Sequence, residues 1–420
     1  MPREERCHIL IVGAGPAGIA AACAAAETCE NVIVLDDNPA PGGQIWRGEE
    51  NRWIGRLRAS RARVCGGTRA VAPLGDGALL AEQQNEPVLF YYEKLILATG
   101  ARELFLPIPG WTLPGVTGAG GLQALVHGGL PIIGKRVVVA GSGPLLLAVA
   151  AHLRGRGALI SAIAEQAPMV RLTCFATQLW RAPGRIAQAS GLAWTLRGVP
   201  RLTSSWPIAV LGDTRLKAVR LHAPKGDREI PCDYLACGFG LIPNTEFAAL
   251  AGCQIHAGFV AVDESQRTTR DSVLCAGEPT GIGGVDRSLL EGRIAGYTAA
   301  CRRDDARRLF PARRRAHAFA TELARAFALR DELKTLAQPD TIVCRCEDVT
   351  IAQATQHDTT RAARLHARCG MGACQGRVCG PALQFITGRA DLTTHARPPL
   401  FPATMATLAA AAPEENPERV

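Results

Sequence analysis

Short apolar runs that end in small or acidic residues recur along the chain and predict an α/β fold. The first set lies at residues 8–12, 32–35, 95–101 and 273–278. A second set, at residues 135–140 and 159–164, repeats the pattern in the middle of the chain. Uninterrupted apolar runs of this length are typical of strands buried in a sheet. We therefore predict two Rossmann-like dinucleotide-binding domains.

The first run leads into a glycine-rich turn of the kind that binds a dinucleotide. Residues 8–12 enter Gly13-Ala14-Gly15-Pro16-Ala17-Gly18, and an alanine-rich helix follows to about residue 27. Gly13 permits the tight turn, Gly15 lets the backbone approach a pyrophosphate, and Gly18 lets helix and strand pack closely. The N-terminus of the helix is then available to bind the phosphates.

An acidic pair and three further loops extend this predicted site. The second run ends at Asp36 and Asp37, about 20 residues after the glycines, where an acid would hold the ribose hydroxyls; we assign that role to Asp36. Close backbone approach to a long ligand is predicted at Gly42-Gly43-Gln44, Ala98-Thr99-Gly100 and Gly277-Glu278. The carboxylate of Glu278 could accept hydrogen bonds from a ribityl chain.

In this order, the segments resemble the two-dinucleotide-binding-domain flavoproteins that include thioredoxin reductase. The resemblance covers about residues 5–300 and implies an FAD domain with an inserted NAD-type domain. It implies FAD contacts from Gly13, Gly15, Pro16, Ala17, Gly18, Asp36, Asp37, Gly43, Gln44, Ala98, Thr99, Gly100, Gly277 and Glu278. No Cys-x-x-Cys pair stands in either domain, so disulfide reduction is not expected.

The second glycine-rich turn departs from the dinucleotide pattern. Residues 135–140 lead into Gly141-Ser142-Gly143-Pro144, and Leu146 stands where the third glycine is expected. A side chain there either forces the helix away from the strand or fills space near the pyrophosphate. The next run ends at Glu165 with no Arg directly after it, which favours NAD or another adenine nucleotide over NADP. The second domain binds NAD, ATP or nothing; the sequence leaves these alternatives open.

Five cysteines crowd into the C-terminal part of the chain, after a charged helical stretch. They occur as Cys344-Arg345-Cys346 and as Cys369-Gly-Met-Gly-Ala-Cys374-Gln-Gly-Arg-Val-Cys379. Thiolates in close pairs, separated by a helical spacer, could enclose a soft metal, and zinc or an iron-sulfur cluster would both suit them.

A second resemblance decides between these metals. The residues CRCE and GMGxCQGRxCG resemble the bacterioferritin-associated-ferredoxin-like [2Fe-2S] domain in the form fused to certain FAD subunits. That resemblance implies ligation by Cys344, Cys346, Cys374 and Cys379. It leaves Cys369 as a spare thiol beside the cluster or as a substitute for one of the four.

Over its whole length, the chain resembles the larger FAD/iron-sulfur subunits of amine and imino-acid dehydrogenase complexes. The order of parts and the residues PGWTLPGV and GSGPLLL carry this resemblance. It implies a smaller FAD-containing partner similar to D-amino-acid oxidases. A small ferredoxin-like subunit is a possible further partner. The partner would oxidise an amine, amino acid or imino acid, such as D-hydroxyproline, proline, an opine or glycine, and this chain would relay the electrons.

These assignments predict a discontinuous domain organisation. We expect an FAD domain at 1–115 and 241–305, an inserted NAD-type domain at 116–240, a helical linker at 306–338, a [2Fe-2S] domain at 339–395 and a tail at 396–420.

Composition and charge limit the partners and the cellular location that we expect. The formal net charge is +9, with only five Lys among 47 Lys and Arg, and the densest basic run contains acids but no aromatic platform, so nucleic-acid binding is not expected. Apolar stretches end well before the roughly 18 residues of a membrane span. The charged N-terminus has no apolar leader, which predicts a cytoplasmic protein.

No catalytic side chain can be assigned, because none of the nine His pairs with an acid at a recognisable spacing. Two other functions remain open. One is a self-sufficient NADH-dependent flavin or ferredoxin reductase, which needs an intact second nucleotide site. The other is a scaffold subunit that binds an adenine nucleotide and catalyses nothing.

Overall fold

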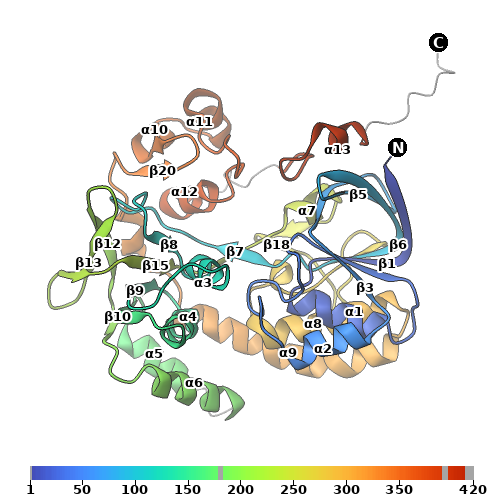
Figure 1. The fold of residues 1–420 in the computed structure, drawn as a ribbon, viewed down its shortest axis with the longest axis horizontal. Helices are drawn as coiled ribbons and strands as arrows, with labels where there is room; N and C mark the ends of the chain where they lie inside the picture. The colour runs from blue at the N-terminus through green and yellow to red at the C-terminus, as the bar shows by residue number, and fades with distance from the viewer. Residues whose placement is uncertain (1, 178–182, 390–395, 412–420) are drawn as a thin grey trace. The chain divides into compact units, whose positions relative to one another are not determined.

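The computed structural model describes residues 2–177, 183–389 and 396–411, and its contacts divide the chain into two compact units (Figure 1). The first unit comprises residues 1–102, 243–320 and 395–420, and the second comprises residues 103–242 and 321–394. The chain crosses between them at β7 (Ala101–Glu103), at β16 (Leu241–Pro243) and within α9 (Arg303–Ala326). Both units are α/β, as the apolar runs predict.

A seven-stranded mixed sheet forms the centre of the first unit, in the order β3-β2-β1-β6-β5-β4, with β19 also paired to β6. β1, β2, β3, β6 and β19 are parallel, and β4 and β5 add an antiparallel edge. The strands are β1 (Arg3–Val12), β2 (Val32–Asp36), β3 (Arg63–Gly66), β4 (Thr68–Pro73), β5 (Ala78–Gln83), β6 (Glu86–Leu97) and β19 (Val273–Cys275). A separate small hairpin comprises β17 (Ile255–His256) and β18 (Phe259–Val260).

Helices of small residues cover this sheet closely. The helices of the unit are α1 (Pro16–Ala25), α2 (Arg52–Ala59), α7 (Glu246–Leu250), α8 (Gly284–Ala299), the first part of α9, and α13 (Met405–Ala409), with a 3₁₀ turn, η2, at Glu278–Thr280. α1 packs against α8, where a methyl group added at Gly292 or Gly296 would lie 2.1 Å or 2.3 Å from a carbonyl oxygen of α1. Only glycine permits such a close approach, so the α1–α8 pair depends on these two residues.

The segment before the C-terminus packs back onto the first unit. The backbone N–H of Leu400 donates to Val71, and Glu82 accepts from the backbone of Thr404 and from the hydroxyl of Thr407. Thr404 also caps α13. Of the predicted tail, residues 396–411 are therefore attached to the sheet edge, whereas residues 412–420 lie outside the described residues.

A five-stranded parallel sheet, in the order β11-β10-β9-β15-β8, forms the second unit. Its strands are β8 (Val116–Gly118), β9 (Arg136–Gly141), β10 (Leu159–Glu165), β11 (Arg201–Thr203) and β15 (Tyr234–Gly238). An antiparallel sheet accompanies it, made of β12 (Trp206–Gly212), β13 (Leu216–His222) and β14 (Arg228–Pro231). The helices are α3 (Ala119–His127), α4 (Leu145–Gly155), α5 (Met169–Ala176) and α6 (Pro183–Thr195).

The cysteine segment folds as a small, mostly helical body within the second unit. Its elements are η3 (Asp331–Thr335), β20 (Ile342–Cys344), β21 (Val349–Thr350), α10 (Ile351–Thr355), α11 (Thr360–Ala367) and α12 (Cys379–Thr387). The indole N–H of Trp111 donates to the carbonyl of Ile342 at 2.6 Å, and the Arg345 guanidinium lies over the Trp111 ring. These contacts attach the segment to Trp111 of the same unit.

The finer domain boundaries stay predictions, because the contact-based units do not separate the cysteine segment from the second sheet. Residues 390–395, at the predicted end of the [2Fe-2S] domain, lie outside the described residues. Within the three described stretches, no helix combines the length and the apolar character that a membrane crossing would need.

Candidate functional site

The predicted FAD residues gather at one edge of the first sheet. β1, β6 and β19 are parallel, and the register aligns Val12, Leu97 and Cys275 at their carboxyl ends. The loops after these strands and after β2 therefore lie together, and this is the edge at which α/β sheets bind ligands. Those loops carry Gly13–Gly18, Asp36–Gly43, Ala98–Gly100 and Gly277–Glu278.

The first glycine-rich turn is tightly packed, in the way the spacing predicts. A methyl group added at Gly13 would lie 2.3 Å from the carbonyl oxygen of Ala98, and Gly13 itself has a φ of +104°. One added at Gly18 would lie 1.8 Å from the carbonyl oxygen of Gly13. Helix α1 therefore begins directly on the strand, with Gly15 as its N-cap and Pro16 as its first residue.

The loop after β2 lies against this turn. Asp36 is buried, and its carboxylate accepts from the backbone N–H of Ala14 at 2.5 Å and from the backbone and side chain of Asn38. Asp37 instead forms an exposed ion pair with Arg69. A methyl group added at Gly43 would lie 2.9 Å from the Cα of Gly15, and the next residue, Gln44, is exposed. The ribose and FAD contacts of these residues stay predictions.

Asn244 ties the Ala98–Gly100 turn to the chain as it re-enters the first unit. Its side-chain amide donates to the carbonyl of Thr99 at 2.9 Å, and its backbone N–H donates to Gly100. The Thr99 hydroxyl donates to the Asn244 carbonyl at 2.6 Å. Sequence reasoning missed Asn244; its position directly after Pro243, at the return into the FAD domain, was the available signal.

Glu278 faces the N-terminus of α8. Its carboxylate accepts from the backbone N–H groups of Gly284 at 3.0 Å and Gly283 at 3.3 Å. Burial raises the pKa of Glu278 above its ordinary value, while these two amides and the Arg287 guanidinium oppose the shift. The predicted hydrogen bonds to a ribityl chain would have to share this carboxylate with the helix.

The segment after the Gly43 loop contains buried donors that a polar ligand such as FAD could satisfy. The buried atoms Arg47 Nε, Asn51 Nδ2 and Trp53 Nε1 have no hydrogen-bond partner within the described residues. All three follow the Gly43 loop, and Asn51 also caps α2. An unsatisfied buried donor costs about 1–3 kcal/mol, so acceptor oxygens from a ligand would stabilise this segment. These residues stand in no motif that indicates a ligand site.

At the second glycine-rich turn, as at the first, backbone donors have partners within the chain. The N–H of Ser142 donates to Gly238, and the N–H of Gly143 donates to the Glu165 carboxylate at 2.7 Å. Pro144 has no N–H, and the amides of Leu146 and Leu147 close 3₁₀-type bonds back to Gly143 and Pro144. These are the groups that bind a pyrophosphate in a dinucleotide fold.

A segment of the chain itself lies over this second turn. The Ser142 hydroxyl donates to the carbonyl of Phe327 at 2.8 Å, and the fully buried Gln166 amide donates to Ser142 and to the Phe327 and Ala328 carbonyls. The Phe327 ring lies 4.0 Å from where a Cβ on Gly143 would stand. Residues 327–328 thus lie against the second glycine-rich turn, a contact that no local motif indicated.

Glu165 should make the stability of the second unit depend on pH. Burial raises its pKa from the ordinary 4.5 to about 7. Between these two values the folded chain binds the proton more tightly than the unfolded chain does, so stability falls as pH rises through this window. The loss is at most about 3 kcal/mol. Unfolding of wild type and Glu165→Gln at pH 5 and pH 8 should show the variant gaining relative stability at pH 8; a constant difference would contradict the prediction.

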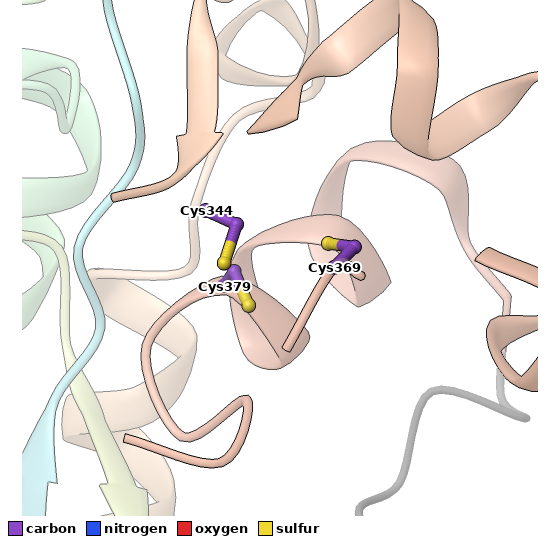
Figure 2. A group of neighbouring side chains, drawn as sticks. All are labelled: Cys344, Cys369 and Cys379. Carbon is purple, nitrogen blue, oxygen red and sulfur yellow. The ribbon is translucent and has the colours of Figure 1, made fainter. Parts of the chain in front are cut away.

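Three of the five cysteines form a buried group in the second unit. Cys344 at the end of β20, Cys369 after α11 and Cys379 at the start of α12 have sulfur atoms within 4.8 Å of one another (Figure 2). Their thiol contacts lower the pKa of Cys344 to about 2 and raise the pKa of Cys369 to about 12; the pKa of Cys379 is raised too.

The other two cysteines form a more exposed pair beside this group. The N–H of Cys374 lowers the pKa of Cys346, whereas burial and the Cys374 thiol raise it, and the net shift is upward. A methyl group added at Gly372 would lie 2.2 Å from the Cβ of Cys346, so the loop before Cys374 closes over that residue. Five sulfur donors in one small body fit a thiolate-bound metal centre, since metal ions replace thiol protons. The ligand set Cys344, Cys346, Cys374 and Cys379 stays a prediction.

Comparisons with known proteins support the predicted dinucleotide-binding fold. Residues 7–302 match the family described as pyridine nucleotide-disulphide oxidoreductase. An opine oxidase subunit from Rhizobium meliloti is 32% identical over 95% of this chain and 98% of its own length. Hydrogen cyanide synthase subunit HcnB of Pseudomonas aeruginosa is 29% identical over 91% of this chain and 94% of its own length.

Solved structures share the fold at lower identity. L-proline dehydrogenase from P. horikoshii superimposes with a TM-score of 0.69 and 18% identity, over 97% of this chain and 80% of its own. Thioredoxin reductase from T. acidophilum gives a TM-score of 0.54 and 19% identity, over 70% of this chain and 98% of its own. At these identities the likeness concerns the fold alone.

Proposed function

The chain belongs to the pyridine nucleotide-disulphide oxidoreductase family, and from this premise we propose that it is the FAD- and [2Fe-2S]-carrying subunit of a hetero-oligomeric dehydrogenase. It is a flavin-dependent oxidoreductase related, over nearly its whole length, to subunits of opine oxidase and hydrogen cyanide synthase. The substrate would be an amine, amino acid or imino acid. A smaller flavoprotein would oxidise that substrate, and this chain would relay the electrons to an acceptor.

The observation that carries this proposal is that residues of the chain itself are bonded to the second nucleotide turn. A self-sufficient reductase needs a nicotinamide cofactor bound there, but residues 327–328 and Glu165 already use the donors of Ser142 and Gly143. Buried donors of Arg47, Asn51 and Trp53, in the segment after the Gly43 loop of the first unit, have no partner among the described residues. Electrons would therefore reach this chain from a partner flavoprotein rather than from NADH. The same feature disfavours a scaffold role that depends on an adenine nucleotide in the second unit.

The chain's own residues would bind and orient the cofactors. Bound FAD accepts an electron pair and an iron-sulfur cluster passes electrons singly, which converts between two-electron and one-electron partners. The amides at the start of α1 would bind the pyrophosphate, and Asp36 would hold the loop beside the ribose. Cys344, Cys346, Cys374 and Cys379 would hold the cluster and exclude water from its buried side.

The test is a visible spectrum, with iron and acid-labile sulfide analysis, of the anaerobically purified chain. We expect flavin and about two irons per chain, no bleaching on addition of NADH, and bleaching of both centres when the partner flavoprotein is added together with imino acid. Rapid reduction of the flavin by NADH alone would contradict the relay and favour the reductase. Failure of the flavin to reduce with any donor would favour the scaffold.

A further inference from the structure

A cluster of buried charges lies beneath the Gly277–Gly281 turn of the first unit. It consists of Arg287 and Glu291 on α8 and Arg313 on α9, whose side chains are 5%, 0% and 17% exposed. Neither the glycine-rich turns nor the cysteine group uses these residues. Burying a carboxylate and two guanidiniums has a large desolvation cost, and such clusters are weak evidence for a role in stability alone.

Glu291 connects the cluster to the turn by four hydrogen bonds. One carboxylate oxygen accepts from the backbone N–H of Gly277 at 3.1 Å and from the Thr280 hydroxyl at 2.7 Å. The other accepts from Arg287 Nε at 2.8 Å and from Arg313 Nε at 3.4 Å. Because both oxygens of this buried carboxylate are bonded to fixed partners, they hold the turn in one conformation.

The turn in question is the one that carries two predicted FAD contacts. Gly277 and Glu278 follow β19 at the ligand edge of the sheet, and Glu278 reaches across to the start of α8. Arg287 passes directly under the same turn: its guanidinium donates to the carbonyl of Thr280, and a methyl group at Gly281 would lie 2.4 Å from Nη1. Glu291 and Arg287 thus determine the direction of the Gly277 amide.

The charges of the cluster do not cancel. Two guanidiniums face one fully buried carboxylate, and Gln266, also fully buried, is neutral. His317, the neighbour on α9, has its pKa lowered by burial and by the two arginines, which keeps it uncharged at neutral pH. Glu278 is the other acid near the cluster, and its carboxylate is bonded to the Gly283 and Gly284 amides of α8 rather than to either guanidinium. The three-residue cluster itself therefore holds two guanidiniums for one carboxylate.

From this geometry we infer that Glu291 is a positioning residue that aims the Gly277–Glu278 turn at the flavin, and that the excess positive charge of Arg287 and Arg313 makes the flavin easier to reduce. This rests on the proposed binding of FAD at the first glycine-rich turn. A positive environment favours the extra negative charge of reduced flavin over the oxidised form. The device would suit a chain that must accept electrons from a partner.

The test compares Arg313→Gln with Arg314→Gln in the FAD-loaded chain. Arg313 is partly buried and bonded to Glu291, whereas its neighbour Arg314 is exposed and pairs with Glu264, so both variants lose one charge on the same helix. We expect Arg313→Gln to retain FAD but to shift the oxidised–reduced equilibrium about tenfold toward oxidised flavin, a potential about 30 mV more negative. Arg314→Gln should match wild type. Dye-coupled potentiometric titration gives both values.

A second variant examines the positioning role. Glu291→Gln keeps the size of the side chain but replaces one of its two acceptor oxygens with an NH2 donor, so we expect FAD to dissociate at least tenfold more readily. A Glu291→Gln chain that binds FAD as tightly as wild type, or an Arg313→Gln chain with an unchanged potential, would overturn the inference while leaving the proposed function intact. A wild-type chain that takes up no FAD would overturn both.

Discussion

Replacing Cys344 with serine should remove nearly all iron and acid-labile sulfide from the purified chain. Cys344 is almost completely buried, and its contacts with the Cys369 and Cys379 thiols favour its thiolate form. A serine hydroxyl cannot supply that soft anionic ligand, and the predicted [2Fe-2S] cluster is held by four of them. Iron should fall from about two atoms per chain to close to zero.

The same substitution should also loosen the cysteine segment itself. Its core has few apolar side chains, chiefly Val343, Val349 and Leu383 with small alanines, and three of its buried members are cysteines. A body of this size seldom folds stably on such a core without a metal. We therefore expect faster proteolysis of residues 339–389 in Cys344→Ser, with the first unit left intact.

Four companion variants decide which sulfurs are ligands. Cys346→Ser, Cys374→Ser and Cys379→Ser should each lose iron as Cys344→Ser does, whereas Cys369→Ser should retain it. Cys301→Ser, at an exposed cysteine of the first unit, serves as the control. Since the structure groups Cys369 with Cys344 and Cys379, iron loss in Cys369→Ser combined with retention in Cys346→Ser would reassign the ligand set.

Local spacing predicted the first glycine-rich turn because each residue there contacts a neighbour that is close in sequence or in the sheet register. Gly13 and Gly18 have to be glycine because carbonyl oxygens stand within 2.3 Å of their missing side chains. Asp36 lies next to the turn because β1 and β2 are adjacent and parallel. The edge of the sheet at which the loops meet could therefore be predicted from the apolar runs alone.

The parts that sequence reasoning could not reach depend on contacts between distant segments. Phe327 covers the second turn from a stretch that reads only as a charged helix and its end, 185 residues after Ser142. From the sequence, Leu146 could either force the helix away from the strand or fill space near the pyrophosphate. In the structure it fills space: it is buried, 3.3 Å from where a Cβ on Gly238 would stand. Glu291 and Arg313 lie on two different helices and contact each other only in the folded chain. In the sequence, each one looks like an ordinary charged residue on the surface of a helix.

Substituting alanine for Gly18 should abolish FAD binding, whereas the same substitution at Gly55 should not. At Gly18 the new methyl group would meet the carbonyl oxygen of Gly13 at 1.8 Å and its carbonyl carbon at 2.9 Å, and backbone atoms of a buried strand cannot move aside cheaply. Overpacking of this kind costs about 1–3 kcal/mol. It would also push α1 away from β1, so the amides that bind the pyrophosphate would no longer converge.

Gly55 provides the matched comparison, because it lies within α2 and nothing stands within 4 Å of its missing side chain. Gly55→Ala should leave FAD binding unchanged and stabilise the helix by about 0.5–1 kcal/mol. Fluorescence titration with FAD, together with chemical unfolding of both variants, separates lost binding from lost stability. If Gly18→Ala bound FAD as wild type does, the helix could not be resting on the strand at Gly13, and the phosphate site would have to lie elsewhere. If both variants lost FAD, the defect would come from replacing glycine in either helix rather than from the α1–β1 contact.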